Sequence, residues 1–407
     1  MQCLSNYLHQ NQIDPKKLYY YSRLVLFVMI GLYVSGCATI VYRSIPLKDI
    51  AKVGGKYPVG TQNYYLVDPA RPMWFTDDIT GPREISVKVW YPADQRGLVK
   101  KAPYVNNQKV ISEALSERLE VPNALMERAG GIDCNSWLEA APAKGKFPIL
   151  IYSHGHQSLK IANTFQAEEL ASYGYIVVAP DHTYDAAITV LANERVVYSK
   201  SRLPGNNQRP SEEDMIARVK KQLTIRTEDV SFLIDKMLQQ ASSADNFMAN
   251  ADTSKIGIFG HSFGGCTSVM AGYSDSRIDA VFGLDTYFLP LPEDIINRDM
   301  NKPFAHLGQP SWGSSNNYSV METLAKKNSK ISTHFAVEGS RHYDFTDFSQ
   351  FTRLTKKFGS GKISPKTIRS IMNTLLLDFF DSSLKGGKKF NPQAYEQVYS
   401  DLTHFSY

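Results

Sequence analysis

The stretch Gly260-His261-Ser262-Phe263-Gly264 decides the fold of this chain. The apolar run Ile256–Phe259 stands directly before it, and the helix-like run Phe263–Gly272 continues from it. A serine between two glycines, at a turn from a buried strand into a helix, is typical of a nucleophile elbow. The glycines let strand and helix approach closely, so the hydroxyl projects at a helix N-terminus, where amide N–H groups favour a developing anion. We therefore predict that Ser262 is a nucleophile; the competing interpretation is a helix-capping serine in a glycine-rich turn.

Short apolar strands alternate with helical segments on both sides of this elbow. Fully apolar strands separated by helices indicate a mostly parallel central sheet that is flanked by helices on both faces, an α/β fold. The expected strands are Asn63–Val67, Ile85–Tyr91, Pro148–Tyr152, Ile176–Ala179, Ile256–Phe259, Ile278–Leu284 and His334–Val337. The expected helices are Thr164–Tyr173, Glu212–Gln240, Phe263–Gly272 and Ile363–Leu384.

Three segments depart from this alternation. Lys100–Lys146 reads as an insertion whose apolar helical face, from Ile111 to Leu119, is expected to pack on the core, with membrane docking as the alternative. Thr189–Pro210 is polar and predicts a loop. Asp181–Asp185 follows a predicted strand, and two interpretations stay open: a turn with satisfied polar groups, or a lining of the substrate cleft.

Composition excludes several classes of protein. The chain has 407 residues, 43% of them hydrophobic and 21% charged, which is ordinary globular usage and excludes disordered, collagen-like and polytopic membrane proteins. The formal net charge is +5, and charged residues of both signs are dispersed along the chain. No basic block therefore predicts a nucleic-acid partner. Four scattered cysteines do not make a disulfide framework.

A serine hydroxyl needs a base, and the base needs an orienting acid. On an elbow of this kind the chain order is serine, acid, histidine. Asp285 follows the strand Ile278–Leu284, at the end of the strand where a site would lie, whereas Asp275 and Asp279 stand at its beginning. We therefore predict that Asp285 is the acid.

The base must come from a histidine after Asp285. His342 ends the loop Glu338–His342 after a predicted strand, where a mobile base is expected. The other candidates are expected inside strands or near the C-terminus; they are His306, His334 and His404. Because the three predicted residues must meet at one sheet edge, the strands from Ile85 to Val337 are expected to belong to one domain.

The segment Tyr152-Ser153-His154-Gly155-His156 follows the strand Pro148–Tyr152. In this kind of site, such a loop supplies the second oxyanion-hole amide, so we predict that the backbone N–H groups of His156 and Phe263 form the hole. The alternative is a metal bound by the two histidines, but no carboxylate or cysteine stands at ligand spacing, so no metal is expected. We expect His154 to shape the loop by hydrogen bonding.

The N-terminal segment predicts a membrane tether. Leu24–Tyr42 holds no charge and follows Lys16, Lys17 and Arg23. Within it, Val34-Ser35-Gly36-Cys37 resembles the lipobox of bacterial lipoproteins, in which Cys37 would be lipidated and become the mature N-terminus. The alternative is an uncleaved transmembrane anchor. We expect residues 1–36 to be a signal peptide or anchor and residues 37–55 a linker.

Beyond the elbow, further motifs resemble the group of α/β-hydrolases that includes the secreted platelet-activating-factor acetylhydrolases, which are calcium-independent esterases of the phospholipase A2 type. The resemblance extends from Val59-Gly60 to about Lys385. The matching pieces are Val87–Pro92, Ser153-His154-Gly155, Ile258–Gly265, Leu284-Asp285 with Phe288–Leu291, and Gly339–His342 with Phe345–Phe348. The chain departs from the family pattern at His156, where an apolar residue is usual.

This resemblance implies an α/β-hydrolase domain over residues 56–390, with a C-terminal tail over 391–407. It implies Asp285 as the acid rather than Asp344 or Asp347, and no metal or cofactor. The reaction that the resemblance implies is hydrolysis of short or oxidised sn-2 acyl esters of glycerophospholipids. The N-terminal segment, with its lipobox-like motif, predicts that the enzyme is tethered in the bacterial cell envelope, on its periplasmic or extracellular face. Two alternatives stay open: a hydrolase of other substrates, such as short-chain esters, polyesters or peptides, and a non-catalytic surface lipoprotein.

Overall fold

The computed structural model describes residues 50–76, 79–119, 123, 127–201, 212–241, 247–312 and 316–407. Leu47–Tyr407 form one compact unit. The predicted signal peptide or anchor over residues 1–36 and the predicted lipidation site Cys37 lie outside the described residues. Within the described ranges, no helix combines the length and the apolar character that a membrane span requires.

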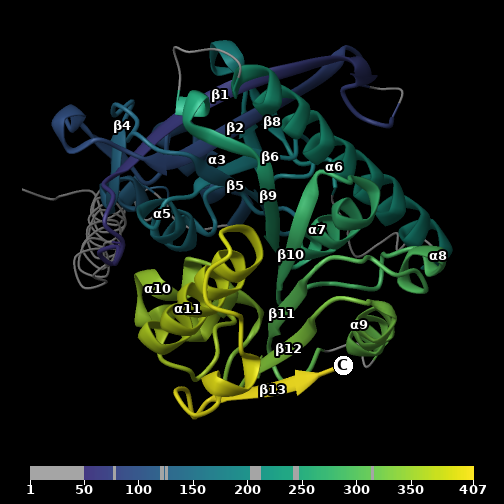
Figure 1. Cartoon of the computed structure of the whole chain (residues 1–407). Coiled ribbons are helices and arrows are strands. Elements are labelled where there is room, and N and C mark those ends of the chain that lie inside the picture. Colours follow the sequence, from purple (N-terminus) through teal and green to yellow (C-terminus); the bar gives the residue numbers. More distant parts are fainter. Residues whose placement is uncertain are drawn as a thin grey trace, which may run out of the picture. The chain divides into compact units, whose positions relative to one another are not determined.

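Within the described ranges, an 11-stranded sheet carries the fold, in the order β13-β12-β11-β10-β9-β5-β6-β2-β1-β4-β3 (Figure 1). Its centre is parallel, from β12 to β6, as the sequence predicts. The parallel strands are β5 (Phe147–Ser153), β6 (Ile176–Asp181), β9 (Ala251–His261), β10 (Ile278–Leu284), β11 (Phe304–Gly308) and β12 (Ser332–Val337). The hairpin of β1 (Val59–Pro72) and β2 (Pro82–Pro92) joins β6 in antiparallel orientation.

Helices cover both faces of the sheet (Figure 1). Alternate side chains of a strand point to opposite faces, so Ile149 and Ile151 of β5 enter one core while Leu150 and Tyr152 enter the other. The first core packs against α6 (Glu212–Ala241), α7 (Phe263–Ser274) and α9 (Asn316–Lys327), and the second against α5 (Thr164–Ser172) and α11 (Pro365–Leu384). Four apolar side chains at helical spacing on α11 are fully buried; they are Ile368, Ile371, Leu375 and Phe379. Two single-turn helices complete this part of the chain, α8 (Glu293–Ile296) and α10 (Phe348–Phe351).

The insertion adds to the sheet edge. Its strands β3 (Lys101–Pro103) and β4 (Asp133–Leu138) pair with each other, and β4 also pairs with β1. Its helix α3 (Gln108–Leu119) turns Ile111 toward a small apolar cluster that includes Tyr104 and Phe165. Of the expected apolar face, Ile111 and the buried Ala114 therefore pack on the body of the protein, as expected, and the side chains of Leu115 and Leu119 lie outside the described part.

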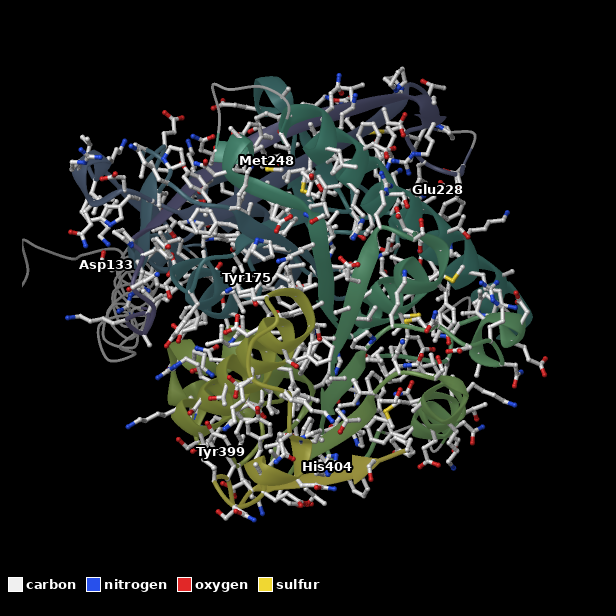
Figure 2. The ribbon with its side chains drawn as sticks, viewed as in Figure 1. Asp133, Tyr175, Glu228, Met248, Tyr399 and His404 are labelled. Atoms are coloured by element: carbon white, nitrogen blue, oxygen red, sulfur yellow. The ribbon has the colours of Figure 1, made fainter. Side chains whose placement is uncertain are left out.

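Three expectations about irregular segments differ from the structure. The expected tail contains β13 (Leu402–Ser406), which pairs with β12 and carries His404 (Figure 2). The ring of His404 bonds the hydroxyl of Thr333 at 2.7 Å. Where the loop Thr189–Pro210 was expected, the structure has a hairpin of β7 (Ile188–Val190) and β8 (Val196–Tyr198). At the end of the expected linker, Gly55 N donates to Ser172 Oγ at 3.0 Å. The three strands are only three to five residues long, so they carry too little apolar periodicity to be predicted from the sequence.

Candidate active site

The turn between β9 and α7 has the geometry of a nucleophile elbow. Ser262 stands between the two elements with φ +56° and ψ −120°, a conformation that costs energy for a residue with a side chain. A Cβ at Gly264 would overlap the carbonyl oxygen of Ser153, which explains the need for glycine at this position. Among the described residues, the side chain of Ser262 makes no capping hydrogen bond to α7, and the residue is 9% exposed. The geometry therefore favours the nucleophile over the capping serine.

Asp285 and His342 form a hydrogen-bonded pair. Asp285 directly follows β10 and is fully buried, whereas the side chain of His342 is 30% exposed. His342 Nδ1 lies 2.6 Å from Asp285 Oδ2. Because a carboxylate accepts the bond, the ring proton sits on Nδ1, and Nε2 is left with a lone pair that can take a proton from a hydroxyl.

Backbone contacts bring Ser262 to the same edge as this pair. Ser262 N donates to Leu284 O at 2.9 Å, and Tyr287 N donates to Ser262 O at 3.1 Å, so the serine is bonded to residues on both sides of Asp285. His261 Nε2 donates to the carbonyl oxygen of His342 at 3.1 Å, and the two rings lie 4.5 Å apart. Burial, together with His342, holds the pKa of His261 well below its usual value, so this ring is neutral. The structure thus gathers the three predicted residues at one sheet edge.

Gln309 supports the acid and was missed by the sequence reasoning. Its backbone N donates to Asp285 Oδ1 and its side-chain Nε2 to Asp285 Oδ2, both at 3.0 Å. The hydroxyl of Tyr318 adds a longer contact to Oδ1 at 3.4 Å. The sequence offered one signal for this residue. Gln309 directly follows β11, so it lies at the same sheet edge as the acid.

The loop after β5 lies against the elbow. A Cβ at Gly155 would come 3.4 Å from the Cβ of Ser262, and the rings of His156 and Phe263 meet edge to face at 6.2 Å. The two predicted oxyanion residues are therefore neighbours beside Ser262. Both ring nitrogens of His154 are used in hydrogen bonds, Nδ1 with Gly155 O and Nε2 with the backbone of His182. In the part of the chain that the structure describes, no group of three or more His, Cys, Asp or Glu side chains could hold a metal ion.

The competing acids and bases have other partners. Asp275 ends α7 and pairs with Arg277, and Asp279 accepts a bond from Ile256 N. Asp347 accepts bonds from the first two amides of α5, Thr164 N and Phe165 N. Two further histidines pair with one another through their Nδ1 atoms at 2.8 Å; they are His306 and His334.

The polar segment Asp181–Asp185 behaves as a buried turn. Asp181 pairs with Lys160 at 2.5 Å, and Asp185 pairs with Arg226 at 3.0 Å. His182, between them, bonds Asp229 at 2.9 Å and is fully buried. Of the two interpretations left open, the turn with paired polar groups fits these contacts better.

An elbow after a central strand of a mostly parallel sheet, with an acid and a histidine after the strands that follow, defines an α/β-hydrolase. The chain belongs to the family described as platelet-activating factor acetylhydrolase, isoform II, whose model matches residues 42–401. This confirms the resemblance seen in the sequence and supports an ester hydrolase.

Individual relatives agree with this family. The platelet-activating factor acetylhydrolase of Gallus gallus is 24% identical over 326 residues, which are 72% of this chain and 76% of the relative. That of Cavia porcellus is 28% identical over 280 residues, 63% of this chain and 62% of the relative. A probable 1-alkyl-2-acetylglycerophosphocholine esterase of Arthroderma benhamiae is 26% identical over 220 residues, 49% of each chain.

A solved structure agrees in fold. The ferulic acid esterase from Streptomyces cinnamoneus matches with a TM-score of 0.71 and 24% identity, over 88% of this chain and 99% of that chain. At this identity the match bears on the fold alone.

Proposed function

We propose that this chain is a serine carboxylic-ester hydrolase that uses Ser262 as nucleophile, His342 as base and Asp285 as orienting acid. The observation that carries the proposal is the 2.6 Å contact between His342 and Asp285, at the sheet edge where Ser262 stands in its strained turn. A surface protein that only binds would gain nothing from a buried carboxylate bonded to a partly exposed histidine beside such a serine. This argues against the non-catalytic alternative.

The mechanism is acyl transfer through a covalent intermediate. His342 Nε2 takes the hydroxyl proton as Ser262 Oγ attacks the ester carbonyl, and Asp285 stabilises the imidazolium that forms. The amides of His156 and Phe263 stabilise the oxyanion of the tetrahedral intermediate; the loss of one such donor typically lowers kcat by about 10²–10³-fold. His342 then protonates the leaving alcohol, and water attacks the acyl-enzyme with His342 again as base.

The proposed substrates are glycerophospholipids with a short or oxidised sn-2 acyl chain. The family and the names of the relatives support this class. Purified protein should hydrolyse sn-2-acetyl phospholipid and short p-nitrophenyl esters much faster than phospholipid with an intact long sn-2 chain. A preference for the long chain would reject this specificity, and hydrolysis of p-nitrophenyl esters alone would favour another ester substrate.

We further propose that Cys37 is lipidated and tethers the enzyme to a membrane in the bacterial cell envelope, on the periplasmic or extracellular face. The support is the apolar stretch with its basic flank and the lipobox-like Val34-Ser35-Gly36-Cys37. Metabolic labelling with an alkynyl fatty acid should mark the wild-type protein and not the Cys37→Ala variant. Equal labelling of both proteins would reject this anchor.

A further inference from the structure

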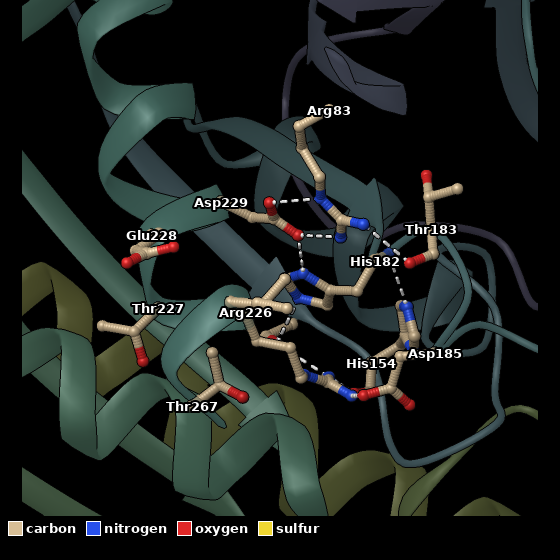
Figure 3. Close-up of polar contacts among 12 residues, drawn as sticks. Arg83, His154, His182, Thr183, Asp185, Arg226, Thr227, Glu228, Asp229 and Thr267 are labelled. Atoms are coloured by element: carbon tan, nitrogen blue, oxygen red, sulfur yellow. Dashed lines mark hydrogen bonds and ion pairs between the residues drawn. The ribbon is translucent and has the colours of Figure 1, made fainter. Parts of the chain in front are cut away.

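A second serine–histidine–aspartate array lies buried in the protein, and Figure 3 shows its His182 and Asp229 with the neighbouring Arg83. Ser153 Oγ lies 3.0 Å from His182 Nε2, and His182 Nδ1 lies 2.9 Å from Asp229 Oδ2. Arg83 closes the array, with Nε 2.9 Å from one oxygen of Asp229 and Nη2 2.6 Å from the other. All four side chains are fully buried.

This array does not have the surroundings of a catalytic triad. Burial removes Ser153 from any substrate, and the guanidinium of Arg226 donates to Ser153 Oγ at 3.2 Å. A hydroxyl that receives a bond from a cation is a poorer nucleophile, since its lone pair is engaged. The array therefore has a structural role, which is to hold the loop that carries His156.

The hydrogen bonds fix the protonation of both histidines. The Asp229 carboxylate accepts from His182 Nδ1, so the proton of a neutral His182 ring sits there and Nε2 accepts from Ser153. The backbone N–H of His182 donates to His154 Nε2 at 3.1 Å, so the proton of His154 sits on Nδ1. Burial and the charge of Arg226 hold the pKa of His154 well below its usual value and lower that of His182 to about 4, so both rings are neutral.

The neutral ring of His154 in turn orients the next peptide. Its Nδ1–H donates to Gly155 O at 2.7 Å, and Ser158 N donates to the same oxygen at 3.1 Å. A trans peptide is planar, with C=O and N–H on opposite sides, so a fixed Gly155 carbonyl fixes the direction of the His156 N–H. Arg226 holds the preceding carbonyl, that of His154, by a short hydrogen bond and also lies 4.9 Å from the ring of Phe263.

We propose that His154 is a positioning residue for the oxyanion hole: held by the buried chain Arg83–Asp229–His182, it aims the Gly155–His156 peptide at the reacting carbonyl. This inference rests on the proposed ester hydrolysis and adds to it the source of the oxyanion geometry. His154 does not touch the substrate; it acts through the backbone of its neighbours.

Kinetics of two variants test this role. His154→Leu removes the Nδ1–H donor, so kcat should fall about 10²–10³-fold while KM changes by no more than about twofold. His154→Asn keeps an N–H donor near the position of Nδ1 and should retain about tenfold more activity than the leucine variant. Thr227→Val is the matched control, since this buried hydroxyl donates within α6, to Leu223 O, and the variant should keep wild-type rates.

A tetrahedral inhibitor separates positioning from general loss of structure. A trifluoromethyl ketone forms an oxyanion adduct, so its affinity should fall in His154→Leu by the same factor as kcat. Unchanged kcat in His154→Leu, equal losses in the leucine and asparagine variants, or a loss that appears only in KM would each overturn the proposal.

A measurement without turnover keeps the inference distinct from the proposed function. Nitrogen-15 spectra of histidine-labelled wild-type protein at about pH 7 should show His154 and His182 as neutral Nδ1–H tautomers. An Nε2–H tautomer at His154 would overturn the positioning role even in an active enzyme. Conversely, the predicted tautomers in a protein that hydrolyses no ester would leave the hydrogen-bond chain intact and reject the proposed function instead.

Discussion

His342 and Asp285 lie 57 residues apart in the chain, and their side chains meet at 2.6 Å. The carboxylate is buried and the imidazole is partly exposed, so the Nδ1 end of the ring is fixed against Asp285. The contact depends on the order of the strands. Asp285 directly follows β10, β11 lies beside β10, and β12 leads into the loop that ends at His342. This relationship is the basis of the catalytic proposal.

Asp285→Asn should inactivate the enzyme without unfolding it. The amide can keep a hydrogen bond to the ring but favours the wrong tautomer, so kcat should fall by about 10⁴-fold. Steady-state kinetics on a short p-nitrophenyl ester measures this. Asp275→Asn is the control, because Asp275 ends α7 and pairs with Arg277. Equal activity in the two variants would reject Asp285 as the acid.

Gln309→Leu should weaken catalysis less than loss of the acid itself. The variant removes the side-chain donor at 3.0 Å to Asp285 Oδ2, and the backbone donor to Oδ1 remains. A less firmly held carboxylate orients His342 less well, and we expect kcat to fall about tenfold with little change in KM. Gln239→Leu, at an exposed position of α6, controls for the change in side chain. Wild-type kcat in Gln309→Leu would show that the amide has no part in orienting the acid.

The close approach at the elbow predicts a stability effect. In Gly264→Ala the new methyl group would overlap the carbonyl oxygens of Ser153 and His154, which are main-chain atoms and cannot turn away. The free energy of unfolding should fall by about 1–3 kcal/mol or more. Gly131→Ala is the control, because a Cβ there meets no atom within 4 Å. Urea unfolding compares the two variants, and equal midpoints would contradict the steric account.

Acid should destabilise the protein before its carboxylates titrate. Burial lowers the pKa of several histidines, and for His182 it lowers it to about 4; the others are His154, His261, His306 and His334. An unfolded histidine has a pKa of about 6.5, so as pH falls below that value the unfolded chain takes up protons that the folded protein does not. The contribution of these histidines to the free energy of unfolding is therefore fully present above about pH 6.5. It decreases toward pH 4, by up to about 1.4 kcal/mol per pH unit for each histidine.

Urea midpoints measured at several pH values between about 7 and 4.5, at constant ionic strength, test this expectation. The stability is expected to decrease as the pH falls because the fold keeps these histidines neutral. A midpoint that stays constant, or rises, as the pH falls would contradict the neutral buried state of these rings.

Much of the candidate site could be predicted because each residue depends on a local pattern. Ser262 is marked by glycines between a strand and a helix, and Asp285 and His342 each follow the end of a strand. Since the carboxyl ends of parallel strands meet at one edge, local patterns were enough to bring distant residues together. The predicted bounds of one strand, Ile278–Leu284, are those of β10.

The supporting contacts could not be predicted in this way. Arg226 reaches His154 across 72 residues, and Arg83 reaches Asp229 across 146. Both contacts depend on how α6 packs beside the sheet, and a long helix with mixed charges offers many equivalent partners before it is packed. The edge strand β13 was missed for a related reason: an edge strand with one exposed side has few apolar residues to mark it.

Covalent labelling with a fluorophosphonate probe, followed by mass spectrometry of the modified peptide, tests the central claim most directly. The account predicts one adduct on wild-type protein, at Ser262, with Ser153 unmodified because it is buried, and no adduct on the Ser262→Ala variant. Failure of the wild-type protein to react, or undiminished labelling of Ser262→Ala, would contradict the assignment of Ser262 as the nucleophile.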